Sequence, residues 1–172
     1  MICLDNDIFS RYASEQSYPA VDRYLTDHAE EAWILPSMVL FEYLKRYESH
    51  NTIQVHRQNA EQSVDAVADL NADIATEAAN LQARLATTNT SLDLADLLIA
   101  ATAREYGATL TTANRNDFDK QPLHELIDID TVHVKSGTDL QPTYRGWIQV
   151  AANCSSTHEW ENRRTTHGGT VR

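Results

Sequence analysis

Short apolar runs alternate along the chain with longer segments whose apolar residues recur at helical spacing. The apolar runs at 1–4, 32–35 and 108–112 predict buried strands, and the alternating stretch 125–134 predicts an edge strand. Helices are predicted over 19–32, from Ser37 through Tyr47, across 57–86 with a division near Asn71, and from Thr90 to a stop at Gly107. This order of elements predicts an α/β fold with a mostly parallel sheet.

Asp96 is the residue that fits its predicted helix least well. Its helical neighbours are mostly apolar: Leu92, Asp93, Ile99 and Ala100. A carboxylate in such a stripe needs a hydrogen-bond partner, a proton or a cation. For a single helical Asp a solvated edge position is the commoner explanation, so the significance of Asp96 depends on the other acids of the chain. Asp96 lies five residues after a predicted N-cap at Ser91.

Three further acids occupy comparable places. Asp5 directly follows the first predicted strand, Asp117 follows the third within a short turn, and Glu42 lies five residues after a predicted N-cap at Ser37. Parallel strands end at one edge of a sheet, and the helices that return from that edge begin there. We therefore expect these three acids to converge with Asp96 on one cleft.

Four converging carboxylates repel one another unless a cation lies between them. Ligands that are all oxygen suit Mg²⁺ or Mn²⁺, and such an ion activates water and neutralises charge on a phosphodiester during displacement. Each position also has an ordinary explanation. Asp5 or Asn6 could be a helix N-cap, and single acids on helices usually face solvent.

Composition narrows the setting without pointing to a reaction. The 172 residues are 42% hydrophobic and 23% charged, which is ordinary for one domain in water. We expect a cytoplasmic protein, because no apolar run is long enough for a membrane span and the first residues lack a signal-peptide pattern. Two cysteines, Cys3 and Cys154, do not indicate a disulfide scaffold.

The charge balance is strongly acidic. The net charge is −11, and only three of the 14 basic residues are lysines. One hypothesis is adaptation to high salt, under which a lysine-poor acidic surface stays hydrated; full stability and solubility without added salt would contradict it. Nucleotide-binding motifs of the GxGxxG and GxxxxGK[ST] types are absent.

Residues 1–134 resemble the PIN-domain ribonucleases, and most closely the VapC toxins of toxin-antitoxin pairs. The resemblance is carried by ICLDNDIF at the start, SMVLFEYL around Glu42, ADLLIAATA around Asp96 and TANRNDF from Thr112 to Phe118. It implies a PIN-like three-layer α/β/α fold and a Mg²⁺-dependent endoribonuclease, with Mn²⁺ as a substitute. The implied catalytic residues are Asp5, Glu42, Asp96 and Asp117, of which Asp5 and Asp96 would be the main metal ligands. Substrate-positioning residues would be Thr112, Asn114 and Arg115.

The resemblance also implies partners. Similar proteins dimerise and are silenced by an antitoxin, for which helices within 57–86 are the predicted groove; the RNA substrate is the third partner, and no membrane is involved. The chain departs from the family where many relatives have Asp-Thr-Asn, because it has Asp5-Asn6-Asp7. Asp7 could reach the cleft or face solvent, whereas Asp93 is assigned to a capping box with Thr90.

Two domain-level assignments follow. Residues 1–134 are the predicted nuclease domain, and 135–172 form a polar C-terminal extension that is disordered, docked on the core or in contact with RNA. Two other functions stay open. A haloacid-dehalogenase-like phosphatase would use Asp5 and Asp7 as its acidic pair but needs a lysine that does not stand out. A non-catalytic PIN-like scaffold would bind RNA or a partner without cutting, although its acids are intact.

Overall fold

The computed structural model describes residues 1–134 and contains a five-stranded parallel sheet with the strand order β3-β2-β1-β4-β5. The strands are β1 (Ile2–Leu4), β2 (Trp33–Pro36), β3 (Ala66–Ala68), β4 (Thr109–Thr112) and β5 (Ile129–Thr131). The helices are α1 (Asn6–Tyr12), α2 (Pro19–Asp27), α3 (Ser37–Leu44), α4 (His50–Gln62), α5 (Ala72–Ala86), α6 (Leu94–Glu105), α7 (Arg115–Phe118) and α8 (Gln121–His124). The predicted extension, 135–172, lies outside the described residues.

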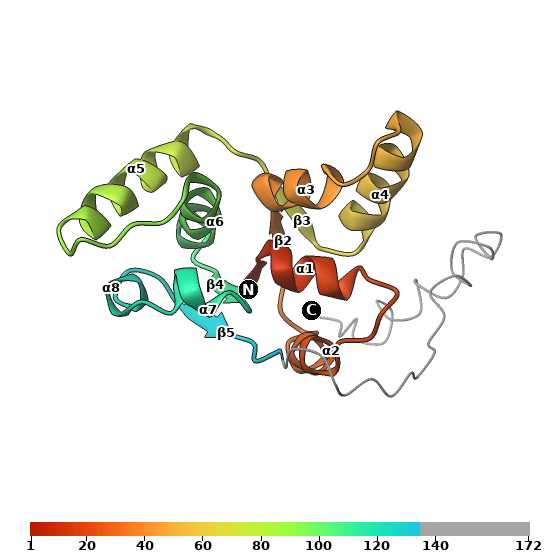
Figure 1. Ribbon diagram of the computed structural model, residues 1–172, viewed down its shortest axis with the longest axis horizontal. Helices are drawn as coiled ribbons and strands as arrows, with labels where there is room; N and C mark the ends of the chain where they lie inside the picture. Colours follow the sequence, from red (N-terminus) through yellow and green to blue (C-terminus); the bar gives the residue numbers. More distant parts are fainter. Residues whose placement is uncertain (135–172) are drawn as a thin grey trace, which may run out of the picture. The chain divides into compact units, whose positions relative to one another are not determined.

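The helices cover both faces of the sheet. Figure 1 shows α1, α2 and α4 on the right of the strands and α5, α6 and α8 on the left. The connections from β1 to β2 to β3 progress toward one edge and those from β3 to β4 to β5 toward the other, so right-handed crossovers place the two helix groups on opposite faces. The three-layer α/β/α prediction is therefore confirmed. No helix in the described part of the chain has the length and apolar character to cross a membrane.

The central strand β1 is buried along its whole length, as expected for a strand with helices on both faces. One face of its core is filled from α1 by Ile8 and Phe9, and the other from α6 by Ile99 and a run of alanines. The small side chains of α6 let this helix lie close to β1 and β4. This packing fixes the start of α6, and hence Asp96, beside the end of β1.

Several predicted element boundaries were wrong. Helix α6 is capped by Asp93 rather than by Thr90 or Ser91, with the Asp93 side chain accepting from Asp96 N at 3.0 Å. Helix α3 begins at Ser37 itself, whose hydroxyl accepts from Leu70 N at 3.1 Å and ties this helix to the chain before α5. Asn71 does cap α5, and Gly107 does end the α6 segment with a φ of 59°.

The segment 57–86, predicted to be helical with a division near Asn71, contains the strand β3. Helix α4 ends at Gln62, and Ala66–Ala68 pairs with β2 before α5 begins. Val64, Val67 and Leu70 have helical spacing, but three residues of strand between two helices are too few to change that periodicity. Smaller differences are that the helix predicted over 19–32 ends at Asp27, the turn 113–119 contains the short helix α7, and the edge strand narrows to 129–131.

Candidate active site

A cleft of about 220 Å³ opens at the carboxyl edge of the sheet, and its lining is almost entirely acidic. It is lined by Asp5, Asn6, Asp7, Glu42, Asp93, Asp96, Asn114 and Asp117. All four acids that the sequence singled out as catalytic are therefore brought together. They come from the end of β1, from α3, from the first turn of α6 and from α7.

Asp5 is the most buried acid, with only 4% of its surface exposed. Its carboxylate accepts from Asn6 N at 2.6 Å and from the Thr112 hydroxyl at 2.7 Å. Burial raises the pKa of Asp5 from 3.8 to about 7, and the negative charges of Asp7 and Asp96 act in the same direction. The two hydrogen bonds oppose the shift without cancelling it. A cation beside this buried carboxyl would favour its ionised form, just as burial favours its protonated form.

Asp96 has the same tendency for a partly different reason. Partial burial raises its pKa to about 6, and the charges of Asp93, Asp117 and Glu42 add to the effect. Lys120 lowers it but does not compensate. The Lys120 ammonium donates to Ser91 O at 3.1 Å, which holds this cation beside the loop that leads into α6.

Thr112 and Asn114 support the acids from the segment that follows β4. Thr112 is fully buried, donates to Asp5 and accepts from Asn114 N at 2.9 Å. The Asn114 side-chain nitrogen donates to Asp117 Oδ2 at 2.8 Å. Thr112 thus orients Asp5 from behind the cleft, and Asn114 orients Asp117 within it.

Arg115, predicted to position substrate, does not line the cleft. Its guanidinium pairs with Asp119 at 2.9 Å, and 57% of its side chain is exposed. Asp119 directly follows the short helix α7 and is four residues from Arg115, whereas residues two positions apart, such as 115 and 117, do not face each other on a helix. The basic group nearest to the acids in sequence is therefore paired with Asp119 and is not part of the cleft lining.

Asp7 and Asp93 line the cleft beside the four predicted acids. Both Asp7 oxygens accept from Ala113 N at 3.1 Å, and Arg11 lies 3.5 Å away. Asp7 therefore ties the start of α1 to the segment after β4, a role that its spacing two residues from Asp5 left undecided. Burial raises the pKa of Asp7, while these donors lower it. Asp93 caps α6, as its assignment to capping anticipated, although with a different partner.

The donor chemistry of the cleft fits a hard divalent cation. Six carboxylate side chains line it, and burial, with a further contribution from neighbouring negative charges, raises the pKa values of Asp5 and Asp96. As the side chains stand, no three His, Cys, Asp or Glu groups within residues 1–134 are close enough together to hold an ion. A cation shared by three of these groups would therefore require the carboxylates to lie closer together than they do here.

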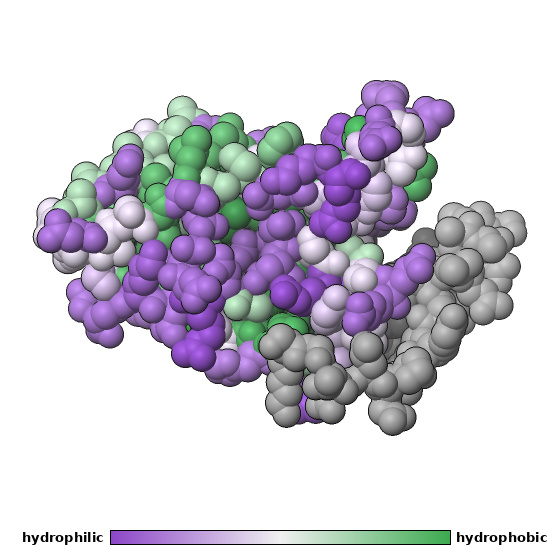
Figure 2. Space-filling model, in the orientation of Figure 1, coloured by the Kyte–Doolittle hydropathy of each residue, from purple (hydrophilic) through white to green (hydrophobic). Residues whose placement is uncertain are grey.

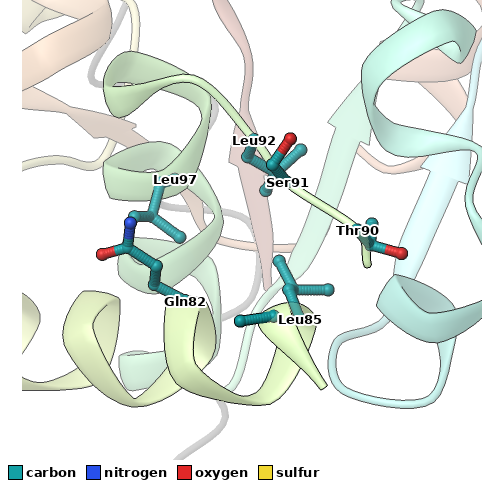
Figure 3. Close-up of a pocket in the computed structure, with 7 residues that line it drawn as sticks. Gln82, Leu85, Thr90, Ser91, Leu92 and Leu97 are labelled. Atoms are coloured by element: carbon teal, nitrogen blue, oxygen red, sulfur yellow. The ribbon is translucent and has the colours of Figure 1, made fainter. Parts of the chain in front are cut away.

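A second hollow of about 110 Å³ lies between the end of α5 and the start of α6. Figure 3 shows Leu85, Leu92 and Leu97 around it, with Gln82, Thr90 and Ser91 at its edges. None of its lining residues is titratable near neutral pH. We therefore treat it as imperfect packing between two helices.

Comparison with known proteins points to one family. Residues 2–122 match the PIN domain family. Comparison with curated proteins gives no match.

Solved structures with the same fold come from several bacteria. A chain of the FitAcB structure from Neisseria gonorrhoeae is 20% identical, with 75% of this chain and 96% of that chain covered and a TM-score of 0.60. A chain of the VapBC2 structure from Rickettsia felis, bound to a promoter DNA fragment, is also 20% identical. The match covers 77% of this chain and 100% of that chain, with a TM-score of 0.62. A chain of a toxin-antitoxin complex from Klebsiella pneumoniae is 20% identical, with 78% of this chain and 100% of that chain covered and a TM-score of 0.59. At these identities the similarity shows a shared fold.

Proposed function

Because the chain belongs to the PIN domain family, we propose that it is a Mg²⁺-dependent endoribonuclease and the toxin of a VapBC-type pair. One observation carries the proposal: Asp5, Glu42, Asp96 and Asp117 line a single cleft at the carboxyl edge of the sheet. Six of the eight residues that line the cleft are acidic and none is basic, which suits an enzyme that functions with a bound divalent ion.

We assign Asp5 and Asp96 as the main ligands of Mg²⁺, or of Mn²⁺ in its place. When bound, the ion supplies positive charge and Lewis acidity for hydrolysis of a phosphodiester. The chain's own residues prepare the site. Thr112 holds the Asp5 carboxylate in one orientation, and Asn114 does the same for Asp117. Preorganised ligands of this kind bind with less loss of side-chain freedom.

Glu42 and Asp117 are less buried than Asp5 and lie at the same cleft. We assign them to orienting the attacking water and accepting its proton, a task for which a carboxylate needs only hydrogen-bond reach. Lys45 follows the last residue of α3, and its Nζ lies 3.6 Å from Glu42 Oε1. This cation and Lys120 are positioned to offset part of the repulsion between RNA phosphates and the acidic cleft.

The phosphatase alternative is weakened by the contacts of Asp7. In that mechanism Asp7 would be a mobile acid, but here both its oxygens accept from Ala113 N and Arg11 is close by. The scaffold alternative does not account for four acids gathered in one cleft.

We further propose that an antitoxin covers the apolar surface beside the cleft. Similar folds occur in toxin-antitoxin complexes, as in that from Klebsiella pneumoniae. Figure 2 shows hydrophobic side chains gathered over α5, α6 and the neighbouring end of α3. Large exposed apolar residues are Phe41 in α3, Leu94 at the start of α6 and Leu70 in the segment that precedes α5. Only Leu70 falls within 57–86, so the proposed surface extends beyond the segment first expected. A homodimer is proposed on the family resemblance alone.

The test is cleavage of single-stranded and structured RNA with Mg²⁺ or Mn²⁺ by the wild type and by Asp96→Asn. We expect a loss of at least about 100-fold, because even residues that only support metal ligands contribute roughly 10–100-fold. Asp73→Asn, at the exposed start of α5, is the matched control and should cut normally. Equal cleavage by wild type and Asp96→Asn would refute the role of Asp96. Hydrolysis of small phosphoesters without RNA cleavage would favour the phosphatase instead.

A further inference from the structure

Asn6 is one of two uncharged residues that line the acidic cleft. The other, Asn114, has its side-chain nitrogen engaged with Asp117 at 2.8 Å. A substrate phosphate entering the cleft meets carboxylates on most sides, and a carboxylate cannot donate a hydrogen bond to it. A neutral amide that presents its N–H groups would therefore be the most useful side chain in the lining.

The Asn6 amide is held in one orientation by Ser10. The Ser10 hydroxyl donates to Asn6 Oδ1 at 2.9 Å and accepts from Arg46 Nη2 at 2.6 Å. A guanidinium can only donate, so its contact occupies a lone pair of Ser10 and leaves the hydroxyl proton for the Asn6 carbonyl. The carbonyl end of Asn6 thus faces Ser10, and its Nδ2 is the end left for the cleft. Within residues 1–134 this nitrogen has no hydrogen-bond partner.

Arg46 is itself fixed. Its Nε donates to Tyr43 O at 2.8 Å, and its guanidinium carbon lies 4.7 Å from the centre of the Tyr43 ring. Arg46 follows the end of α3, so the contacts link α3 through Ser10 to the first turn of α1. A charged donor at the start of such a chain polarises the bonds that follow and makes the terminal amide a stronger donor.

We propose that Asn6 Nδ2 donates to a non-bridging oxygen of the substrate phosphate, and that Ser10 and Arg46 are positioning residues that aim it. The inference rests on the proposed function, because it assumes that the cleft receives a phosphodiester. It also gives a role to the residue that stands where many relatives have a small hydroxyl. The longer amide keeps a donor at that place and adds a carbonyl that Ser10 can hold.

Two variants of Asn6 distinguish the loss of its hydrogen-bond donor from a change in the size of its side chain. Asn6→Ala removes the donor, and Asn6→Asp keeps the shape but presents only acceptors. We expect KM for a short single-stranded RNA to rise about tenfold in Asn6→Ala, with kcat within about twofold, since a hydrogen bond to a charged group is lost. Asn6→Asp should raise KM further. Asn80→Ala, on the exposed surface of α5, is the control and should leave KM unchanged.

The positioning residues are tested by a pair of Ser10 variants. Ser10→Ala should raise KM about threefold to fivefold, because the amide then turns freely, whereas Ser10→Thr retains the hydroxyl and should behave as wild type. Thermal midpoints within a few degrees of wild type show that each variant is folded. Equal KM values for Ser10→Ala and Ser10→Thr would overturn the role of Ser10.

Binding provides a readout that does not depend on turnover. Fluorescence anisotropy with a labelled short RNA compares the Asp96→Asn protein with the double variant that also carries Asn6→Ala. The double variant should have a Kd about tenfold higher. Unchanged Kd and KM would overturn the contact even if the wild type cleaves RNA normally. Absence of cleavage by the wild type would instead refute the proposed function, and the anisotropy series would then decide separately whether Asn6 contacts RNA.

Discussion

Asp5→Asn should stabilise the metal-free protein, and more so at high pH. In the unfolded chain the Asp5 carboxyl ionises near its ordinary pKa of 3.8, whereas in the folded protein it does so near 7. Below about pH 4 the group is neutral in both states and costs nothing. As pH rises, the unfolded state loses its proton first, so folding stability falls until the folded state ionises too. Above about pH 7 the cost is constant.

The size of the effect follows from the two pKa values. The gap between 3.8 and about 7 corresponds to about 4 kcal/mol, at roughly 1.4 kcal/mol for each tenfold change in ionisation. At about pH 5 only about 1.6 kcal/mol of this cost is present. Asn keeps the shape and can still accept from Asn6 N, and any hydrogen-bond energy that it loses is the same at both pH values. The stability difference between variant and wild type should thus shift by about 2–3 kcal/mol in favour of the variant from about pH 5 to 8.

Urea unfolding at these two pH values, in buffer with EDTA, measures this shift directly. The free energies of unfolding come from linear extrapolation, and Asp73→Asn serves as the matched exposed substitution. A stability difference that stays the same at both pH values would refute the argument that ionised Asp5 destabilises the metal-free fold.

Three other predictions concern the same framework. Mg²⁺ should raise the thermal midpoint of the wild type by several degrees and leave Asp96→Asn nearly unmoved in differential scanning fluorimetry; equal shifts would argue that the ion binds elsewhere. Thr112→Val should lower the free energy of unfolding by about 1–3 kcal/mol, because a fully buried hydroxyl that bonds Asp5 is lost, whereas Thr112→Ser should be much milder in the same urea assay. Asn71→Ala should lower the free energy of unfolding by about 1 kcal/mol, because the N-cap of α5 is lost. The control is Asn80→Ala, which changes an Asn within α5 that is not a cap. Equal urea midpoints for the two variants would contradict the capping role of Asn71.

The sequence was sufficient for the architecture where periodicity and strand order agreed. Three apolar runs and one alternating stretch located four of the five described strands, and the parallel arrangement followed from the helices between them. The missing strand, β3, has only three residues between two helices, so no alternation could accumulate. Helix starts were misplaced because several residues near 90–93 can cap, and only tertiary packing decides that Asp93 does so.

The sequence predicted which segments meet at the cleft, but it did not predict the directions of all their side chains. The convergence of Asp5 and Asp117 follows from the rule that parallel strands end at one edge, and that of Asp96 from the start of a returning helix at the same edge. The pairing of Arg115 with Asp119 could not be predicted, because it depends on the short helix α7, where the sequence indicated a polar turn. Whether Asp7 reaches the cleft could not be predicted either. It is the second residue of α1, and its contact with Ala113 depends on how a distant segment packs. The metal, the catalytic roles and the domain boundary at residue 134 remain predictions.

The insertion of β1 between β2 and β4 has a consequence for synthesis in the cell. The first strand leaves the ribosome early, but its partner β4 begins at Thr109 and Asp117 comes later still. A nascent chain therefore carries some of the acids for most of its translation without the neighbours that would gather them. If the protein cuts RNA, the ribosome that makes it is exposed to a competent active site only after nearly all of this domain has been translated.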